Sequence, residues 1–135
     1  MKKLLLVSTI LLLTGCFGET GKGYITKTCK KIEQVNKINI YKNITLKSKQ
    51  GNLTYLTINE KYETESDMTS IINSKKSEAN MYTNETGINT NIEDNIITYH
   101  IDITKASELV IERFNIKKET HKMIKYYEEK GYTCE

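Results

Sequence analysis

The chain has 135 residues, with 20 basic and 17 acidic side chains, no proline and no tryptophan. This near-balance of charge excludes the extended basic surface of a nucleic-acid-binding protein, so we expect no nucleic-acid partner. The length that remains after a short N-terminal segment suits one domain.

The start of the chain shows the three zones of an export signal. Lys2 and Lys3 give a positive start, residues 4–13 form an apolar run, and small residues lead to Cys16. A membrane-spanning helix needs about 20 apolar residues, and this run is about half as long. We therefore predict a signal peptide over residues 1–15 and no transmembrane span.

The sequence Leu-Thr-Gly-Cys at residues 13–16 resembles the lipobox of bacterial lipoproteins. In a lipobox the cysteine thiol receives a diacylglyceryl group, and a peptidase then cuts before it, here between Gly15 and Cys16. The alternative is an ordinary signal peptide that contains a cysteine. Two acyl chains of the palmitate type suffice for stable anchoring. We expect a lipid anchor on the extracytoplasmic side of the cell membrane, or in the outer membrane if the source is Gram-negative.

The rest of the chain divides into a tether and one domain. Residues 16–23 contain three glycines and predict a flexible tether, and residues 24–135 predict a single domain. Alternation of apolar and polar residues favours strands, with Lys42 as the one break in the second of them. The expected strands cover residues 24–32, 38–46, 53–62, 87–93 and 97–103.

Three helices are expected between and after these strands. The first begins with a capping arrangement at Thr64 and Asp67 and ends near residues 81–84. The second is short and capped by Thr104, with Leu109 among its inward-facing residues. The third ends at Gly131, and residues 132–134 could return along the sheet edge. The fold class is therefore predicted as α+β, an antiparallel sheet of about five strands packed by two or three helices.

Two cysteines remain once Cys16 is assigned to the anchor. Cys29 lies at the start of the domain and Cys134 is the penultimate residue. Outside the cytoplasm an even pair favours a disulfide, which would tie the two ends of the domain together. The alternatives are two free thiols or one reactive thiol. A redox function is not expected, because the sequence contains no Cys-x-x-Cys motif.

The candidate catalytic residues are few. His100 and Asp102 share one face of a predicted strand, a spacing that could place an imidazole beside a carboxylate for general base chemistry. No nucleophile motif and no third metal ligand accompany them, so we interpret them as two solvated polar residues. His121 is placed on the surface of the last helix. We predict no catalytic residue, no metal site and no cofactor.

A resemblance to a known family appears in three stretches. The sequences YITKTCKKIEQVNKINIYKN, GINTNIEDNIITYHIDITKASEL and MIKYYEEKGYTC are similar to segments of the YehR-like family of small bacterial lipoproteins. In the second stretch the matching positions are Asp102, Thr104, Lys105 and Ala106. The likeness spans about residues 24–133 and the lipobox. It implies an antiparallel sheet packed by helices, and it brings no biochemical activity with it.

Three functions are compatible with the sequence. The first is a non-enzymatic module that binds an unknown protein or small molecule at the cell envelope, held to the membrane by diacylglyceryl-Cys16. The second is an enzyme acting on envelope material through His100 and Asp102. The third is a structural or inhibitory lipoprotein. The small size, the tether and the lack of catalytic groups favour the first.

Overall fold

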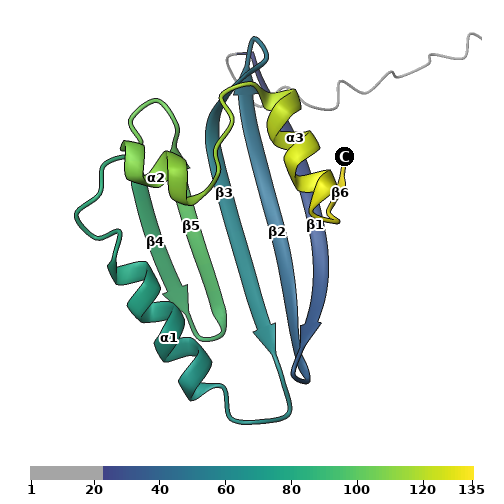
Figure 1. Cartoon of the computed structure of the whole chain (residues 1–135), viewed down its shortest axis with the longest axis vertical. Helices are drawn as coiled ribbons and strands as arrows, with labels where there is room; N and C mark the ends of the chain where they lie inside the picture. The colour runs from purple at the N-terminus through teal and green to yellow at the C-terminus, as the bar shows by residue number, and fades with distance from the viewer. Residues whose placement is uncertain (1–22) are drawn as a thin grey trace, which may run out of the picture.

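The computed structural model describes residues 23–135, which form one six-stranded antiparallel sheet and three helices (Figure 1). The strand order across the sheet is β4-β5-β3-β2-β1-β6. The elements are β1 (Tyr24–Val35), β2 (Ile38–Lys49), β3 (Asn52–Glu63), α1 (Thr69–Asn80), β4 (Ile88–Glu93), β5 (Ile96–Asp102), α2 (Glu108–Arg113), α3 (Thr120–Glu129) and β6 (Thr133–Cys134).

The expected count of about five strands is wrong, because β6 is a sixth member of the sheet. It has two residues, too few for an alternating pattern to be visible in the sequence. Its backbone pairs with the edge strand β1, where Cys29 stands opposite Cys134. Two further hydrogen bonds join Thr28 and Glu135, at 3.0 and 2.9 Å. Pairing with β1 therefore defines this strand.

The strands β1, β2 and β3 form a meander of three twelve-residue strands joined by tight turns. Both turns require left-handed backbone, with φ of 49° at Asn36, 67° at Lys37, 53° at Gln50 and 79° at Gly51. Two-residue hairpin turns with positive φ match the twist of the strands they connect.

All three helices pack on one face of the sheet (Figure 1). The strands direct their apolar side chains to this face, and the helices supply Val110 and Met123, both fully buried. The remaining fully buried side chains come from the strands: Cys29, Ile44, Leu46, Leu56, Ile97 and Ile101. We call this side of the sheet the helix face.

The helix starts differ from the expected caps. α1 begins at Thr69, whose backbone N–H donates to Asp67 at 2.9 Å, and Thr64 lies outside the helix. α2 is capped by Ser107, whose hydroxyl accepts from the backbone N–H of Val110. Leu109 is half exposed and does not face the core as expected. Gly131 ends α3 with φ of 86°, as predicted.

Gly87 fits closely against the loop between β5 and α2. Its φ is 77°, and an added Cβ would lie 2.6 Å from the Lys105 carbonyl carbon and closer still to the Ala106 backbone. The Gly87 carbonyl accepts from the Asp102 N–H at 2.7 Å. Only glycine satisfies both the backbone angle and this approach, so Gly87 fixes the start of β4 beside the end of β5.

Candidate functional site

The side of the sheet opposite the helices, which we call the open face, carries side chains from five strands. None of the three helices covers it, because all three pack on the helix face. The strand registers align its residues in rows, such as Thr28, Thr45, Thr57, His100 and Asn89 from β1 to β4. The neighbouring rows contain Thr26, Lys47, Tyr55 and Asp102 on one side and Lys30, Asn43, Asn59, Thr98 and Asn91 on the other.

A β-bulge shapes one end of this face. The register between β2 and β3 shifts beyond Lys47, so that Thr54 is an extra residue on β3 and donates its hydroxyl to the Lys47 carbonyl at 2.8 Å. As a result Leu53 is buried on the helix face, whereas Tyr55 is 41% exposed on the open face. Simple alternation would have placed both residues on the same side. The bulge therefore directs an aromatic ring to the open face.

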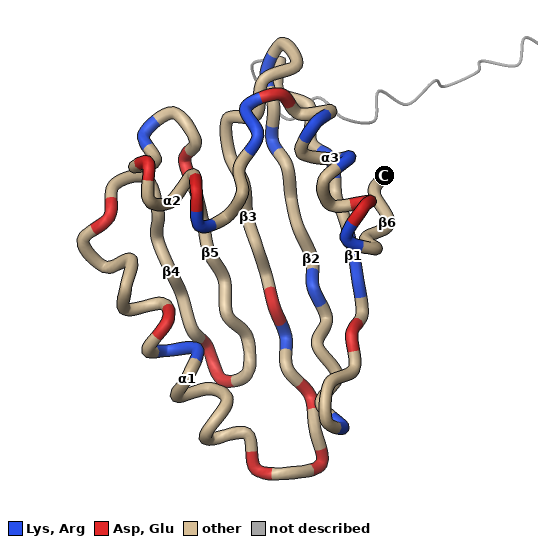
Figure 2. Tube along the Cα trace, viewed as in Figure 1, with Lys and Arg blue, Asp and Glu red and all other residues tan. Residues whose placement is uncertain are grey.

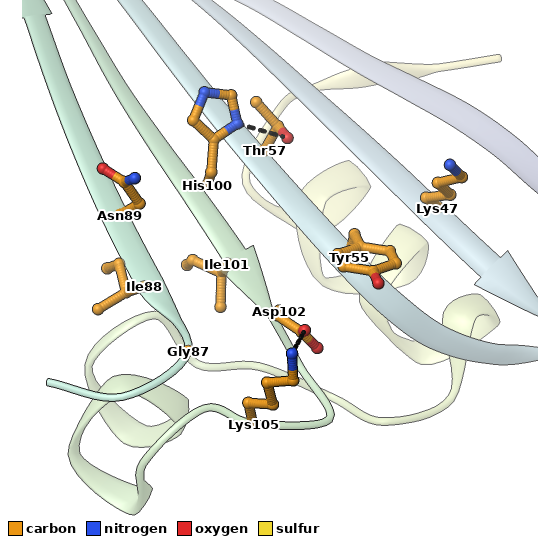
Figure 3. A pocket seen from close by; sticks show the side chains of 10 residues that line it. All are labelled: Lys47, Tyr55, Thr57, Gly87, Ile88, Asn89, His100, Ile101, Asp102 and Lys105. Atoms are coloured by element: carbon orange, nitrogen blue, oxygen red, sulfur yellow. Dashed lines mark hydrogen bonds and ion pairs between the residues drawn. The ribbon is translucent and has the colours of Figure 1, made fainter.

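One hollow on the open face is a shallow groove of about 540 Å³ (Figure 3). Three adjacent strands (β3, β5 and β4), the end of β2 and the loop after β5 line it. Its lining residues are Lys47, Tyr55, Thr57, Gly87, Ile88, Asn89, His100, Ile101, Asp102 and Lys105. This groove contains both candidate residues named from the sequence, His100 and Asp102.

His100 and Asp102 both line the groove, but they do not form an acid–base pair. The Asp102 Oδ1 accepts from the Thr104 hydroxyl at 2.6 Å and from its backbone N–H at 3.1 Å, and Lys105 Nζ lies 3.5 Å from Oδ2. The bond from the Thr104 hydroxyl lowers the pKa of Asp102. His100 Nδ1 instead lies 3.4 Å from the Thr57 hydroxyl. The carboxylate therefore stabilises the turn after β5, and it does not orient the imidazole.

These contacts also explain the Asp-x-Thr-Lys-Ala stretch, which is one part of the sequence that resembles the YehR-like family. Thr104 does not cap a helix, because its hydroxyl and N–H are both bonded to Asp102. Ala106 is the residue against which Gly87 packs. The stretch has a structural role, holding the loop that forms one wall of the groove.

The remaining site predictions have separate outcomes. Cys29 and Cys134 are joined by a disulfide with a Cα–Cα distance of 4.0 Å, so the predicted bridge is confirmed. Gly15 and Cys16 lie outside the described residues. His121 is exposed on α3, as expected. No group of three potential metal ligands occurs within residues 23–135. No helix in that range is long and apolar enough to cross a membrane.

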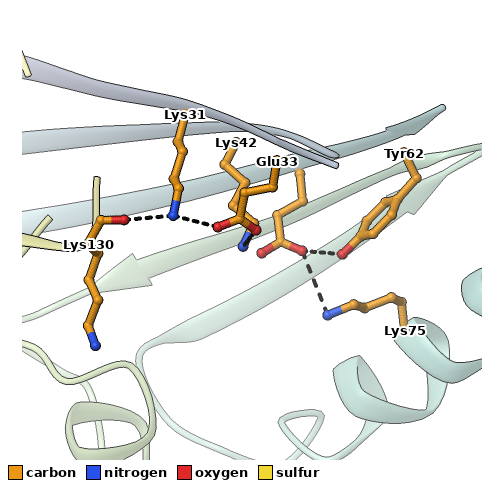
Figure 4. A network of polar contacts seen from close by, with 7 residues as sticks. Lys31, Glu33, Lys42, Tyr62, Lys75 and Lys130 are labelled. Carbon is orange, nitrogen blue, oxygen red and sulfur yellow. Dashed lines mark hydrogen bonds and ion pairs between the residues drawn. The ribbon is translucent and has the colours of Figure 1, made fainter. Parts of the chain in front are cut away.

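A charged network lies on the helix face, where sequence reasoning placed only a break in the pattern at Lys42 (Figure 4). Glu33 accepts from Lys31 at 2.6 Å and from Lys42 at 2.8 Å. Lys31 also donates to the Lys130 carbonyl at 2.6 Å. The hydrogen bonds from Lys31 and then Lys42 lower the pKa of Glu33. This network joins the end of α3 to the edge of the sheet.

The same figure shows a second charged cluster nearer α1. Tyr62 donates its hydroxyl to Glu60, and Lys75 of α1 lies 3.7 Å from the same carboxylate. Burial, followed by the hydrogen bond to Glu60, raises the pKa of Tyr62. Both clusters therefore attach helices to the sheet, which is a structural role.

Comparison with known proteins identifies a fold and no family. No family model matches the chain, and no curated protein matches it. One solved structure, the NMR structure of a protein from Streptococcus pneumoniae TIGR4, is similar with a TM-score of 0.53 and 14% sequence identity. The match covers 100% of this chain and 97% of the other. At this identity the likeness concerns the fold alone.

Proposed function

We propose that this chain is a YehR-like bacterial lipoprotein anchored through Cys16, and that its domain is a non-enzymatic binding module at the cell envelope. The anchor is supported by the three zones of residues 1–15 and by the lipobox that ends at Cys16. The family assignment is supported by the three stretches of similar sequence. The binding role is supported by the open face.

The observation that carries the binding role is the one-sided packing of the sheet. Within residues 23–135, a five-strand surface of threonine, asparagine, lysine and tyrosine side chains has no covering layer, and a groove of about 540 Å³ lies within it. Its donors and acceptors point outward in register, and the groove walls are fixed by Gly87 and the Asp102 turn. A fixed surface loses little conformational entropy when a ligand binds.

The contacts of His100 and Asp102 support a role without catalysis. A general base needs a partner that orients it, and Asp102 is engaged by Thr104 and Lys105. We expect His100→Gln, which keeps a hydrogen-bonding side chain in the groove but removes the imidazole base, to preserve the phenotype of the intact gene. If that variant instead reproduced a clear deletion phenotype, with normal folding, the enzyme hypothesis would replace this one.

The anchor is tested by substitution of the lipobox cysteine. Cys16→Ser removes the thiol that accepts the diacylglyceryl group, so the variant should accumulate as an unlipidated precursor. Metabolic labelling with a radioactive or clickable fatty acid, followed by mass determination, measures this directly. Normal acyl labelling of Cys16→Ser would reject the anchor.

The binding face is tested by site-specific photo-crosslinking in intact cells. A photoreactive amino acid at His100 places the probe in the groove, and the same residue at Ser74 places it on the exposed side of α1. We expect discrete adducts at His100 and none at Ser74. Equal adducts at the two positions, or adducts at Ser74 alone, would show that the open face is not the binding surface.

A further inference from the structure

Charged residues are distributed unequally between the two ends of the sheet (Figure 2). One end contains the start of β1, the β2–β3 turn and the connection to α3. It carries a group that we call the basic end: Tyr24, Lys47, Lys49, Tyr55, Lys117 and Lys118. The opposite end carries Glu63, Glu65, Asp67, Glu93 and Asp94, with Lys37 and Lys61 among them.

Hydrogen bonds hold the parts of the basic end together. Lys49 is paired with Tyr24 across β1 and β2 and with Asn52 across the turn. The Leu53 N–H donates to the Lys118 carbonyl at 2.7 Å. The Thr120 N–H donates to the Gly51 carbonyl at 3.0 Å. The lysines of two separate segments, the end of β2 and the connection to α3, therefore lie at the same end of the sheet.

The lysines of the basic end have no acidic partner among residues 23–135. Within that range no ion pair involves Lys47, Lys49, Lys117 or Lys118. Two carboxylates near these lysines are paired with other lysines, Asp102 with Lys105 and Glu119 with Lys122. The surface thus presents a net positive charge to its surroundings.

Tyrosine rings lie among these lysines. Lys47 Nζ is 4.8 Å from the centroid of the Tyr24 ring and 5.8 Å from that of Tyr55. Lys49 Nζ is 5.9 Å from the Tyr24 ring. Tyrosine combines an apolar body with a polar tip and is enriched where proteins meet the headgroup layer of a membrane. Mixed basic and aromatic surfaces suit anionic lipid.

The position of the proposed lipid anchor indicates which partner this surface contacts. Six residues lie between Cys16 and Gly23, which directly precedes β1, so the two are seven residue steps apart. Fully extended, seven residues span at most about 25 Å. Because β1 starts at the basic end, a lipid on Cys16 would hold this end within about 25 Å of the bilayer.

We propose that the basic end docks on the anionic phospholipid headgroups of the membrane that holds Cys16. This inference rests on the proposed anchor. Docking orients the strands away from the bilayer. The opposite end of the sheet, which carries Glu63, Glu65, Asp67, Glu93 and Asp94, then lies farthest from the membrane. Each lysine at an anionic surface strengthens partitioning about fivefold, and the attraction fades beyond a Debye length of about 8 Å at physiological salt.

Vesicle cosedimentation tests the docking without the lipid anchor. The chain from residue 16 onward with Cys16→Ser is suitable, because all six strands, the three helices and the disulfide lie within residues 23–135. We expect it to bind vesicles of phosphatidylcholine with phosphatidylglycerol and not vesicles of phosphatidylcholine alone. Binding should weaken as salt is raised, because the attraction is electrostatic.

A matched pair of charge reversals locates the contact. Lys49→Glu with Lys118→Glu should lower the partition coefficient at least about 25-fold, from two lysines at about fivefold each. Lys37→Glu with Lys76→Glu makes the same change in net charge at exposed positions away from the basic end and should have a much smaller effect. Circular dichroism confirms that both variants fold.

Equal losses in the two variants, or no preference of the parent chain for phosphatidylglycerol, overturns the docking. Neither result bears on the proposed anchor, which is tested separately by acyl labelling of Cys16 in the full chain. Conversely, a chain that is not acylated but binds phosphatidylglycerol through Lys49 and Lys118 rejects the anchor and retains the docking surface. The two proposals therefore fail by different measurements.

Discussion

Removing the Cys29–Cys134 disulfide should cost this domain a large part of its stability. The bridge joins residues 105 positions apart and closes nearly the whole domain into one loop. In the chain-entropy relation a loop of that size restricts the unfolded chain by about 4.8 kcal/mol at 25 °C. Small domains are stable by about 5–15 kcal/mol, so the loss is comparable with the total of a weak one.

The assay is urea unfolding of the Cys29→Ala, Cys134→Ala double variant beside the wild type. We expect a loss of about 4–5 kcal/mol and a melting temperature lower by about 20 °C. The slope of the free energy of unfolding against urea should increase, because an unbridged chain exposes more surface when it unfolds. Alanine suits both positions, since Cys29 is fully buried and a hydroxyl there would lack solvent.

Wild-type protein treated with reductant is the control, and it should match the double variant. A loss below about 1 kcal/mol with an unchanged slope would refute the reasoning, because the loop constraint acts on the unfolded state throughout the chain. It would mean that reduction frees only β6, whose two residues pair with β1 without contributing to the rest of the sheet.

Three further predictions concern single residues. Gly87→Ala should destabilise the domain about 2 kcal/mol more than Gly51→Ala in thermal unfolding, because both have positive φ but only Gly87 faces backbone atoms within van der Waals contact; equal losses would contradict this. Glu33→Gln should cost about 1 kcal/mol at neutral pH. The pKa of Glu33 is lower in the folded protein than its ordinary value of 4.5, so the ionised carboxylate stabilises the fold above pH 4.5 and this stabilisation is lost as the pH falls through the folded pKa. If the wild type remained more stable than Glu33→Gln in acid, the ion pairs of Glu33 would not be the cause of the difference. Tyr62→Phe should cost about 1–3 kcal/mol in urea unfolding, whereas Tyr99→Phe should be neutral or stabilising, because the buried Tyr99 hydroxyl has no partner within residues 23–135; a larger loss at Tyr99 would reverse this assignment.

Features that depend on local sequence could be predicted, because the chain itself contains their cause. The alternation from Ile97 to Ile101 predicts that one face of β5 lies in the core, and the residues on that face, Ile97, Tyr99 and Ile101, are buried. Gly51 and Gly131 adopt the left-handed backbone that their turn and helix end require. The cysteine pair could be inferred because two cysteines remained and the expected export signal predicted an oxidising environment, in which an even number of cysteines favours a disulfide.

Features that depend on pairing between distant segments could not be predicted. Nothing local indicates that β5 lies beside β3 while α1 and β4 intervene in the chain. The groove residues Lys47, Tyr55 and Asn89 come from three strands and meet only through this order and the bulge at Thr54. Lys42 was visible only as an irregularity, because its partner Glu33 belongs to the neighbouring strand.

The charged network on the helix face also bears on how copies of this protein behave toward each other. β6 pairs with only two residues of β1, so the other half of that strand is an edge of the sheet, and Ile32 there is 68% exposed. Unpaired apolar edges invite another chain to add a strand, and inward-pointing charges are one natural protection against it. A strand added beside Lys31 and Glu33 would have to cover their ion pair. The contacts that attach α3 to the sheet thus also protect the edge from aggregation at high local concentration.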